Sequence, residues 1–131
     1  MGTVNYLLDT HTLLWRANGS PLLSNPAAEA IDDPTNRCLV SAASAWELAT
    51  KFRLGRLTEA ETLLNRYQPT LQQLGLEELA ISGQHGLLAG SFDGHHRDPF
   101  DRMLAAQALS EGAVLITKDP AFAEFPVRTL W

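Results

Sequence analysis

The sequence predicts an α/β fold in which a mostly parallel sheet is covered by helices on both faces. Strand-like and helix-like segments alternate along the whole chain, a pattern typical of parallel sheets. The best strands are continuous apolar runs, as expected for strands that are buried on both faces. At 131 residues the chain has the length of one globular domain, and no repeat or linker divides it. We therefore expect a single domain over residues 1–131.

In the first half of the chain, VNYLL at 4–8 predicts a buried strand that leads directly into a helix over 11–17. NPAAEAID at 25–32 predicts a short helix, since Pro26 suits the first turn. RCLVS at 37–41 is a second strand, and the helix that follows it is expected to end just before Gly55.

The second half continues the alternation. Residues 99–111 predict a buried helix, because Met103 to Leu109 are apolar on nearly every side except at Gln107. The other expected elements are helical segments at 58–68 and 70–74 separated at Pro69, a short strand at 76–81, a weak helix at 82–91, a strand at 113–117, a helical turn at 119–125 and a last strand at 127–130.

Composition limits the function classes. No apolar stretch approaches the roughly 20 residues that span a bilayer, and the N-terminal segment lacks the basic start of a signal peptide and is interrupted by Asp9. We expect a cytoplasmic protein with no membrane partner. Cys38 is the only cysteine, which excludes an internal disulfide and a cysteine-based zinc site. A net charge of −5 argues against nonspecific coating of nucleic acid, but a bound metal reverses the local sign.

Carboxylates occur at the junctions between strands and helices. Asp9 ends the first strand, Glu47 lies early in the helix after the second, and Asp119 follows the strand at 113–117. Asp98 and Asp101 open the buried helix. In a parallel sheet these junctions share the edge where ligands bind, so the acids are able to converge.

Several of these acids also have a purely structural explanation as helix caps. Asp9 and Asp119 occupy positions that suit an N-cap. Asp98 is a better cap still, because Pro99 then takes the first helical position and Asp101 falls at the third.

Glu47 has two alternative structural explanations. Ser44 and Glu47 match the S-x-x-E spacing of a capping box, and Glu47 with Lys51 forms an i,i+4 ion pair in the favourable orientation. Ser41 is a competing helix start, however, and a helix that begins there places Glu47 beyond the first turn, where it is no cap.

A metal site is the explanation that covers the acids together. Asp101 shares a helical stripe with Leu104, Ala105 and Ala108, which points its carboxylate inward, where it needs a cation or hydrogen bonds. Asp9 has no basic partner nearby in sequence. Several like charges at one edge repel unless they are neutralised, and oxygen ligands suit Mg²⁺ or Mn²⁺. Such an ion polarises a phosphodiester and activates water for in-line attack.

Other chemistries lack their residues. The chain contains no G-x-S-x-G, P-loop or H-E-x-x-H pattern. His95 and His96 are adjacent and rarely able to face one ion, so we expect this pair to matter least. A phospho-receiver domain needs adjacent acids after the first strand, where position 10 is Thr10, and a haloacid-dehalogenase-like phosphatase needs D-x-D, where position 11 is His11.

Four segments together resemble a known family. They are YLLDTHTLLW at 6–15, VSAASAWELATKFRLGRL at 40–57, HRDPFDRMLAAQAL at 96–109 and LITKDPAF at 115–122. In this order and spacing, the sequence resembles the PIN domain and, within it, the VapC-type toxins of bacterial toxin–antitoxin pairs. The resemblance implies a three-layer α/β/α fold and a Mg²⁺- or Mn²⁺-dependent endoribonuclease that hydrolyses RNA with metal-activated water, leaving a 5′-phosphate and a 3′-hydroxyl.

The family's four acids map onto this sequence. The resemblance implies that the catalytic and metal-binding residues are Asp9, Glu47, Asp101 in DRMLAAQA, and Asp119 of the T-x-D pattern. Asp9 and Asp101 are the expected principal ligands, and Thr117 is a supporting hydroxyl. RDPFDR offers two aspartates, and the inward stripe favours Asp101 as the ligand. We therefore assign Asp98 to the helix cap, with a supporting role beside the metal.

Basic residues near the acids are candidates for binding the RNA backbone. Lys51, Arg102 and Lys118 are the main candidates, with Arg53 and Arg56 as further ones; simple exposed, solubilising charge is an equal alternative.

The resemblance also implies a VapB-like antitoxin whose extended segment presents a basic side chain to the acidic cleft, and a homodimer. An acidic cleft that attracts a cation also attracts arginine. The alternatives are a catalytically silent PIN-like binding module and a metal nuclease with another nucleic acid target.

Overall fold

The computed structural model describes residues 4–131 and contains a five-stranded sheet in the order β3-β2-β1-β4-β5. Every strand pairing is parallel. The strands are β1 (Asn5–Leu8), β2 (Arg37–Ser41), β3 (Leu76–Leu79), β4 (Val114–Ile116) and β5 (Thr129–Leu130). Because the chain runs outward from β1 to β3 and then returns to β4, the strand order reverses between β1 and β4. Ligands of open parallel sheets bind beyond the carboxyl ends of the strands at such a reversal.

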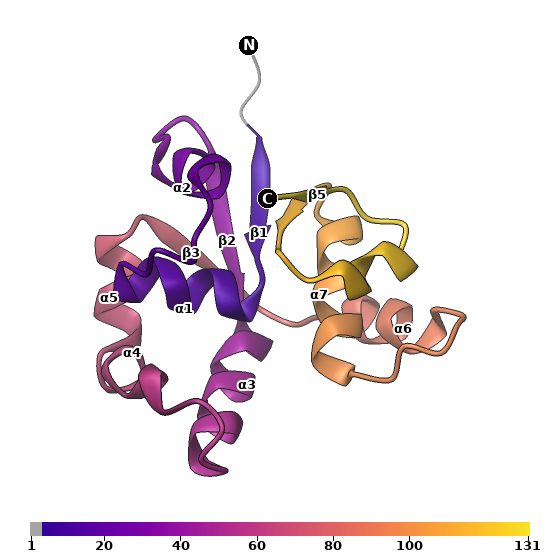
Figure 1. The fold of residues 1–131 in the computed structure, drawn as a ribbon. Coiled ribbons are helices and arrows are strands. Elements are labelled where there is room, and N and C mark those ends of the chain that lie inside the picture. The colour runs from indigo at the N-terminus through magenta and orange to yellow at the C-terminus, as the bar shows by residue number, and fades with distance from the viewer. Residues whose placement is uncertain (1–3) are drawn as a thin grey trace.

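Helices cover both faces of this sheet, which confirms the predicted fold class. In Figure 1, α1, α4 and α5 lie on one side of the strands and α6 and α7 on the other. The helices are α1 (Thr10–Asn18), α2 (Asn25–Asp32), α3 (Ala42–Arg53), α4 (Glu61–Asn65), α5 (Tyr67–Gln73), α6 (Gly83–Ser91) and α7 (Pro99–Ser110), with 3-10 helices η1 (Thr58–Ala60) and η2 (Pro120–Glu124). None of the helices within residues 4–131 has the length and hydropathy needed to cross a bilayer.

Alternation along the central strands divides the core into two clusters. Leu7 of β1 pairs in register with Leu39 of β2 and Leu115 of β4, and all three face the cluster that contains Leu104 of α7. The next residue of each strand faces the opposite cluster, with α1 to α5; these residues are Leu8, Val40 and Ile116. Since both faces of these three central strands are buried, their sequences contain short apolar runs.

One predicted boundary is wrong. The expected break at Pro69 lies instead at Arg66, whose backbone (φ −135°, ψ 38°) leaves the helical region between α4 and α5. Pro69 is the third residue of α5. Proline is tolerated in a first turn because the N–H groups there have no partner within the helix. The segment predicted as one helix over 58–68 is also divided, into η1 and α4.

Candidate active site

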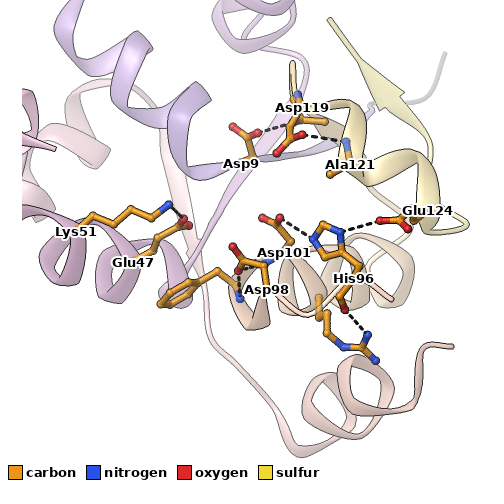
Figure 2. Close-up of polar contacts among 12 residues, drawn as sticks. Asp9, Glu47, Lys51, His96, Asp98, Asp101, Asp119, Ala121 and Glu124 are labelled. Carbon is orange, nitrogen blue, oxygen red and sulfur yellow. Dashed lines mark hydrogen bonds and ion pairs between the residues drawn. The ribbon is translucent and has the colours of Figure 1, made fainter. Parts of the chain in front are cut away.

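A cavity of about 380 Å³ opens at the carboxyl edge of the sheet, where the strand order reverses. All five acids that the sequence singled out line this cavity: Asp9, Glu47, Asp98, Asp101 and Asp119. Figure 2 shows these side chains pointing toward one space from several different elements. The convergence expected from the junctions of a parallel sheet is therefore present in the structure.

Asp9 is both a helix cap and a wall of the cavity. It follows β1 directly, and its Oδ1 accepts a hydrogen bond from the backbone N–H of Thr12 (2.7 Å), which caps α1. Its Oδ2 accepts from the hydroxyl of Thr117, the residue after β4. Thr117 in turn accepts from the backbone N–H of Asp119 (3.0 Å). The two strands at the reversal thus fix the Asp9 carboxylate, with 7% of the residue exposed.

Glu47 is not part of a capping box. Ser41 is the N-cap of α3, so Glu47 lies in the second turn, and the alternative based on Ser44 is excluded. Glu47 accepts a hydrogen bond from the hydroxyl of Thr10 and pairs with Lys51 (2.5 Å). The expected i,i+4 ion pair is confirmed, and both oxygens of a carboxylate that is almost fully buried have a donor.

The two aspartates that open α7 have different surroundings. Asp98 is the N-cap, and its Oδ1 accepts from the backbone N–H groups of Phe100 (2.8 Å) and Asp101 (3.2 Å). Asp101, in the first turn, has a side chain that is 17% exposed. Burial raises the pKa of Asp101 to about 6, against a hydrogen bond with His96 that lowers it, and the negative charges of Asp98 and Glu47 raise it further.

His96 is the functional candidate that sequence reasoning missed. Its Nε2 lies 2.8 Å from Asp101 Oδ2, and its Nδ1 lies 2.9 Å from Glu124 Oε2 (Figure 2). Burial lowers the pKa of His96, but hydrogen bonds to Glu124 and Asp101 outweigh this effect and hold the pKa above its usual value. The pattern H-x-x-x-x-D offered no signal, because Glu124 comes from η2, far along the chain.

Asp119 and two of the basic candidates line the cavity, whereas the third main candidate does not. Asp119 caps η2 by accepting from the N–H of Ala121 (2.9 Å). Lys51 and Lys118 line the cavity, and the Lys118 ammonium lies 6.0 Å from the ring centroid of Trp15. Arg102 is not among the lining residues.

The position of Arg102 has a structural cause. Its guanidinium donates to the carbonyls of Ala89 (2.8 Å), His96 (2.9 Å) and Phe92 (2.6 Å). These bonds hold the segment between α6 and α7 and commit the donors that RNA binding would need. Arg53 and Arg56 are likewise outside the lining of the cavity.

Comparison with known proteins identifies the family. The family model of the PIN domain matches residues 6–127. The chain belongs to the PIN domain family. It is 30% identical to Ribonuclease VapC22 of Mycobacterium tuberculosis over 115 residues, which are 86% of this chain and 85% of that protein. It is 33% identical to Ribonuclease VapC16 of the same organism over 61 residues, which are 47% of this chain and 43% of that protein.

The fold of this PIN domain is also similar to that of a solved structure. The crystal structure of VapBC2 from Rickettsia felis, bound to a DNA fragment from their promoter, has a TM-score of 0.68 at 18% identity, covering 97% of this chain and 98% of that one. Together these relatives confirm the resemblance to PIN domains and VapC ribonucleases.

The donors in this PIN domain fit a hard divalent cation. Five carboxylates and two ammonium groups line the cavity, so negative charge is in excess. Asp98, Asp101 and Asp119 each keep one oxygen without a hydrogen-bond partner among residues 4–131. No three acidic, histidine or cysteine side chains in that range form a complete ligand cluster. Mg²⁺ is commonly bound by one or two carboxylates, with waters completing the shell, so the donor set is compatible with Mg²⁺ or Mn²⁺.

Proposed function

We propose that this PIN domain is a Mg²⁺- or Mn²⁺-dependent endoribonuclease and the toxin of a toxin–antitoxin pair. The observation that supports the proposal most is the convergence of five carboxylates in one cavity with only two ammonium groups. Asp9 and Glu47 are buried and Asp101 is partly buried, and carboxylates withdrawn from water in this way are costly in a fold that does not use them. The VapC relatives named as ribonucleases support RNA as the substrate.

Asp9 and Asp101 are the proposed principal ligands, and Glu47 and Asp119 complete the site or orient water. Asp9 is held by the backbone N–H of Thr12, in the first turn of α1, and by the hydroxyl of Thr117, which follows β4; these two contacts limit its motion. Among residues 4–131, one oxygen of Asp101 has no hydrogen-bond partner. A bound Mg²⁺ or Mn²⁺ supplies polarisation of the phosphate and a lowered pKa of water.

Lys118 is the better placed of the two lysines to contact an RNA phosphate. Lys51 is already paired with Glu47 (2.5 Å), whereas Lys118 is exposed at the cavity and forms no ion pair in the described part of the chain. We propose Lys118 as a backbone contact, while Lys51 keeps Glu47 in place.

The acidic cavity also suits an antitoxin. A VapB-like partner that inserts an arginine would place a cation among the same carboxylates, which are geometrically suited to guanidinium pairing. The solved VapBC2 complex of similar fold supports an antitoxin partner; the inserted arginine is part of the proposal. We further propose that the toxin forms a homodimer.

The decisive experiment compares Asp101→Asn with Asp98→Asn in RNA cleavage. We expect Asp101→Asn to lower the cleavage rate at least about 100-fold, because a direct ligand should matter more than the supporting contacts around a metal. Asp98→Asn should retain most activity, because asparagine is an equally good N-cap. Loss of cleavage in Asp98→Asn with retention in Asp101→Asn would contradict the assignment.

Excess EDTA tests the metal requirement. Wild-type protein that cleaves RNA equally well in EDTA contradicts metal catalysis. Metal binding that requires Asp9 but is accompanied by no cleavage of any RNA favours the catalytically silent module instead. A titration of wild type and Asp9→Asn with Mn²⁺ makes that distinction.

A further inference from the structure

His96 is held in place at its ring and at its backbone, although it lies in the segment before α7. Its side chain is 12% exposed, and both ring nitrogens contact carboxylates, Asp101 at 2.8 Å and Glu124 at 2.9 Å. The ring therefore cannot turn about its axis without losing two hydrogen bonds. In Figure 2 it lies between these two carboxylates, as a bridge from η2 to the first turn of α7.

The His96 side chain packs against a residue of the hydrophobic core. The ring of Phe125 meets the His96 ring edge-on, with centroids 5.1 Å apart. Phe125 is 5% exposed and belongs to the core cluster of α7 and the sheet. The carbonyl of His96 accepts from Arg102 (2.9 Å), a residue of α7. A side chain that merely covered the surface would not need support at three points.

Asp101 depends on this bridge more than Asp9, Glu47 or Asp98 depends on any single partner, and Asp119 alone also has one donor among residues 4–131, the backbone N–H of Ala121. His96 provides the only hydrogen bond to the Asp101 carboxylate from residues 4–131. Asp9 and Glu47 each have two donors, and Asp98 receives two backbone N–H groups. Without His96, the Asp101 carboxylate would be free to rotate away from the cavity.

We propose that His96, fixed by Glu124, is a positioning residue that orients the Asp101 carboxylate toward the bound metal. Through Oδ2 it holds one oxygen, which leaves Oδ1 for the ion. The inference rests on the proposed metal site, but it concerns metal binding rather than RNA cleavage. Hydrogen-bond partners that orient a metal ligand commonly contribute 10–100-fold to metal affinity.

Two conservative substitutions separate the contacts of His96. The amide nitrogen of His96→Gln lies near the place of Nε2 and retains a donor for Asp101. The amide nitrogen of His96→Asn lies near the place of Nδ1 and retains a donor for Glu124 only. His95→Gln is the matched control, because His95 neighbours His96 and has no side-chain hydrogen bond in the described residues.

The measurement is the Mn²⁺ dissociation constant of the purified chain without RNA, by calorimetry or electron paramagnetic resonance. We expect His96→Asn to weaken Mn²⁺ binding about 10-fold or more, and His96→Gln and His95→Gln to remain within about threefold of wild type. Glu124→Ala should lie between His96→Asn and wild type. Urea unfolding in EDTA checks that the variants are folded. We expect them to be folded, because Asp98 caps α7 independently of His96.

Three outcomes would overturn the proposal. They are wild-type affinity in His96→Asn, equal losses in His96→Gln and His96→Asn, and a wild-type chain that binds no Mn²⁺. Only the last also removes the proposed metal site. A wild-type chain that binds Mn²⁺ but cleaves no RNA contradicts the ribonuclease proposal and leaves the role of His96 supported by the rescue in His96→Gln.

Discussion

Glu47 of α3 and Asp101 of α7 face the same cavity from different helices, but the fold treats their charges differently. Glu47 is 4% exposed and has two donors, the hydroxyl of Thr10 and the ammonium of Lys51. In the described part of the chain Asp101 has one donor, the ring of His96 from an irregular segment. The comparison indicates that the fold compensates Glu47 with an ammonium and a hydroxyl, whereas Asp101 has only a histidine that it shares with Glu124.

The difference has a cost in stability. Burial raises the pKa of Asp101 to about 6, so its ionised form is less favourable in the folded chain than in the unfolded one. Functional sites commonly contain such groups, whose removal stabilises the fold while activity is lost. The following substitutions test whether the two acids differ in this way.

The largest expected effect on stability comes from Lys51→Met. It leaves the buried Glu47 carboxylate without its charged partner, and we expect the free energy of unfolding to fall by about 2–3 kcal/mol. This is below the usual cost of breaking a buried pair, because the Lys51 side chain is 31% exposed. Urea unfolding at neutral pH in EDTA measures the change.

Glu47→Gln completes the double-mutant cycle with Lys51→Met. The double variant should lose less than the sum of the two single losses, since residues in direct contact couple. Strict additivity would show that Glu47 is stabilised by Thr10 alone, and the contrast with Asp101 would then be weaker.

The opposite sign is expected for Asp101→Asn in the metal-free protein. At pH 8 the substitution should raise the free energy of unfolding by about 2 kcal/mol, because one pKa unit corresponds to about 1.4 kcal/mol and the charge is partly solvated. The raised pKa means that the folded state binds more protons between about pH 4 and pH 6. Stability from this group therefore falls as pH rises through that window.

The pH dependence makes the test of Asp101→Asn specific. The advantage of the variant should be full at pH 8 and absent near pH 3, below the pKa of Asp101 in both the unfolded and the folded chain, where the carboxyl is protonated in both states. Urea unfolding in EDTA at the two pH values measures it. A variant that is destabilised equally at both values would show that Asp101 is stabilising, as Glu47 is.

The sequence predicted the acids of this site because their positions follow from rules of parallel sheets. Asp9 and Asp119 lie at strand ends, and Asp98 precedes a proline at a helix start, so topology alone brings them to one edge. The expected Asp98 cap and the deeper position of Asp101 are both present, while the choice of Asp101 as metal ligand stays a prediction. The alternation of strand-like and helix-like segments also predicted the parallel direction of the strands, the helices on both faces of the sheet and nearly all of the individual elements.

The sequence did not predict the contacts that depend on the path of irregular segments. His96 meets Glu124 only because the segment before α7 lies against η2, and no periodicity reports such a contact. Arg102 was expected near RNA from its charge, but its guanidinium donates to nearby carbonyls. Charge and spacing in the sequence indicate which side chains are candidates for the site. The direction in which each side chain points depends on backbone positions that no local sequence pattern determines.

The smallest effect is expected for Asp98, and it tests whether the first turn of α7 separates capping from metal binding. Asp98→Ala removes the acceptor for two backbone N–H groups and should lower the free energy of unfolding by about 1 kcal/mol, whereas Asp98→Asn should change it by less than about 0.5 kcal/mol. Both should leave the Mn²⁺ dissociation constant within about threefold of wild type if Asp98 only caps the helix.

Urea unfolding and the Mn²⁺ titration measure both quantities on the same samples. Weaker Mn²⁺ binding in Asp98→Asn, at unchanged stability, would show that the Asp98 carboxylate itself contributes to the metal site. The cavity would then contain two acids of α7 in need of a cation, and the contrast with Glu47 would concern the whole first turn of α7 rather than Asp101 alone.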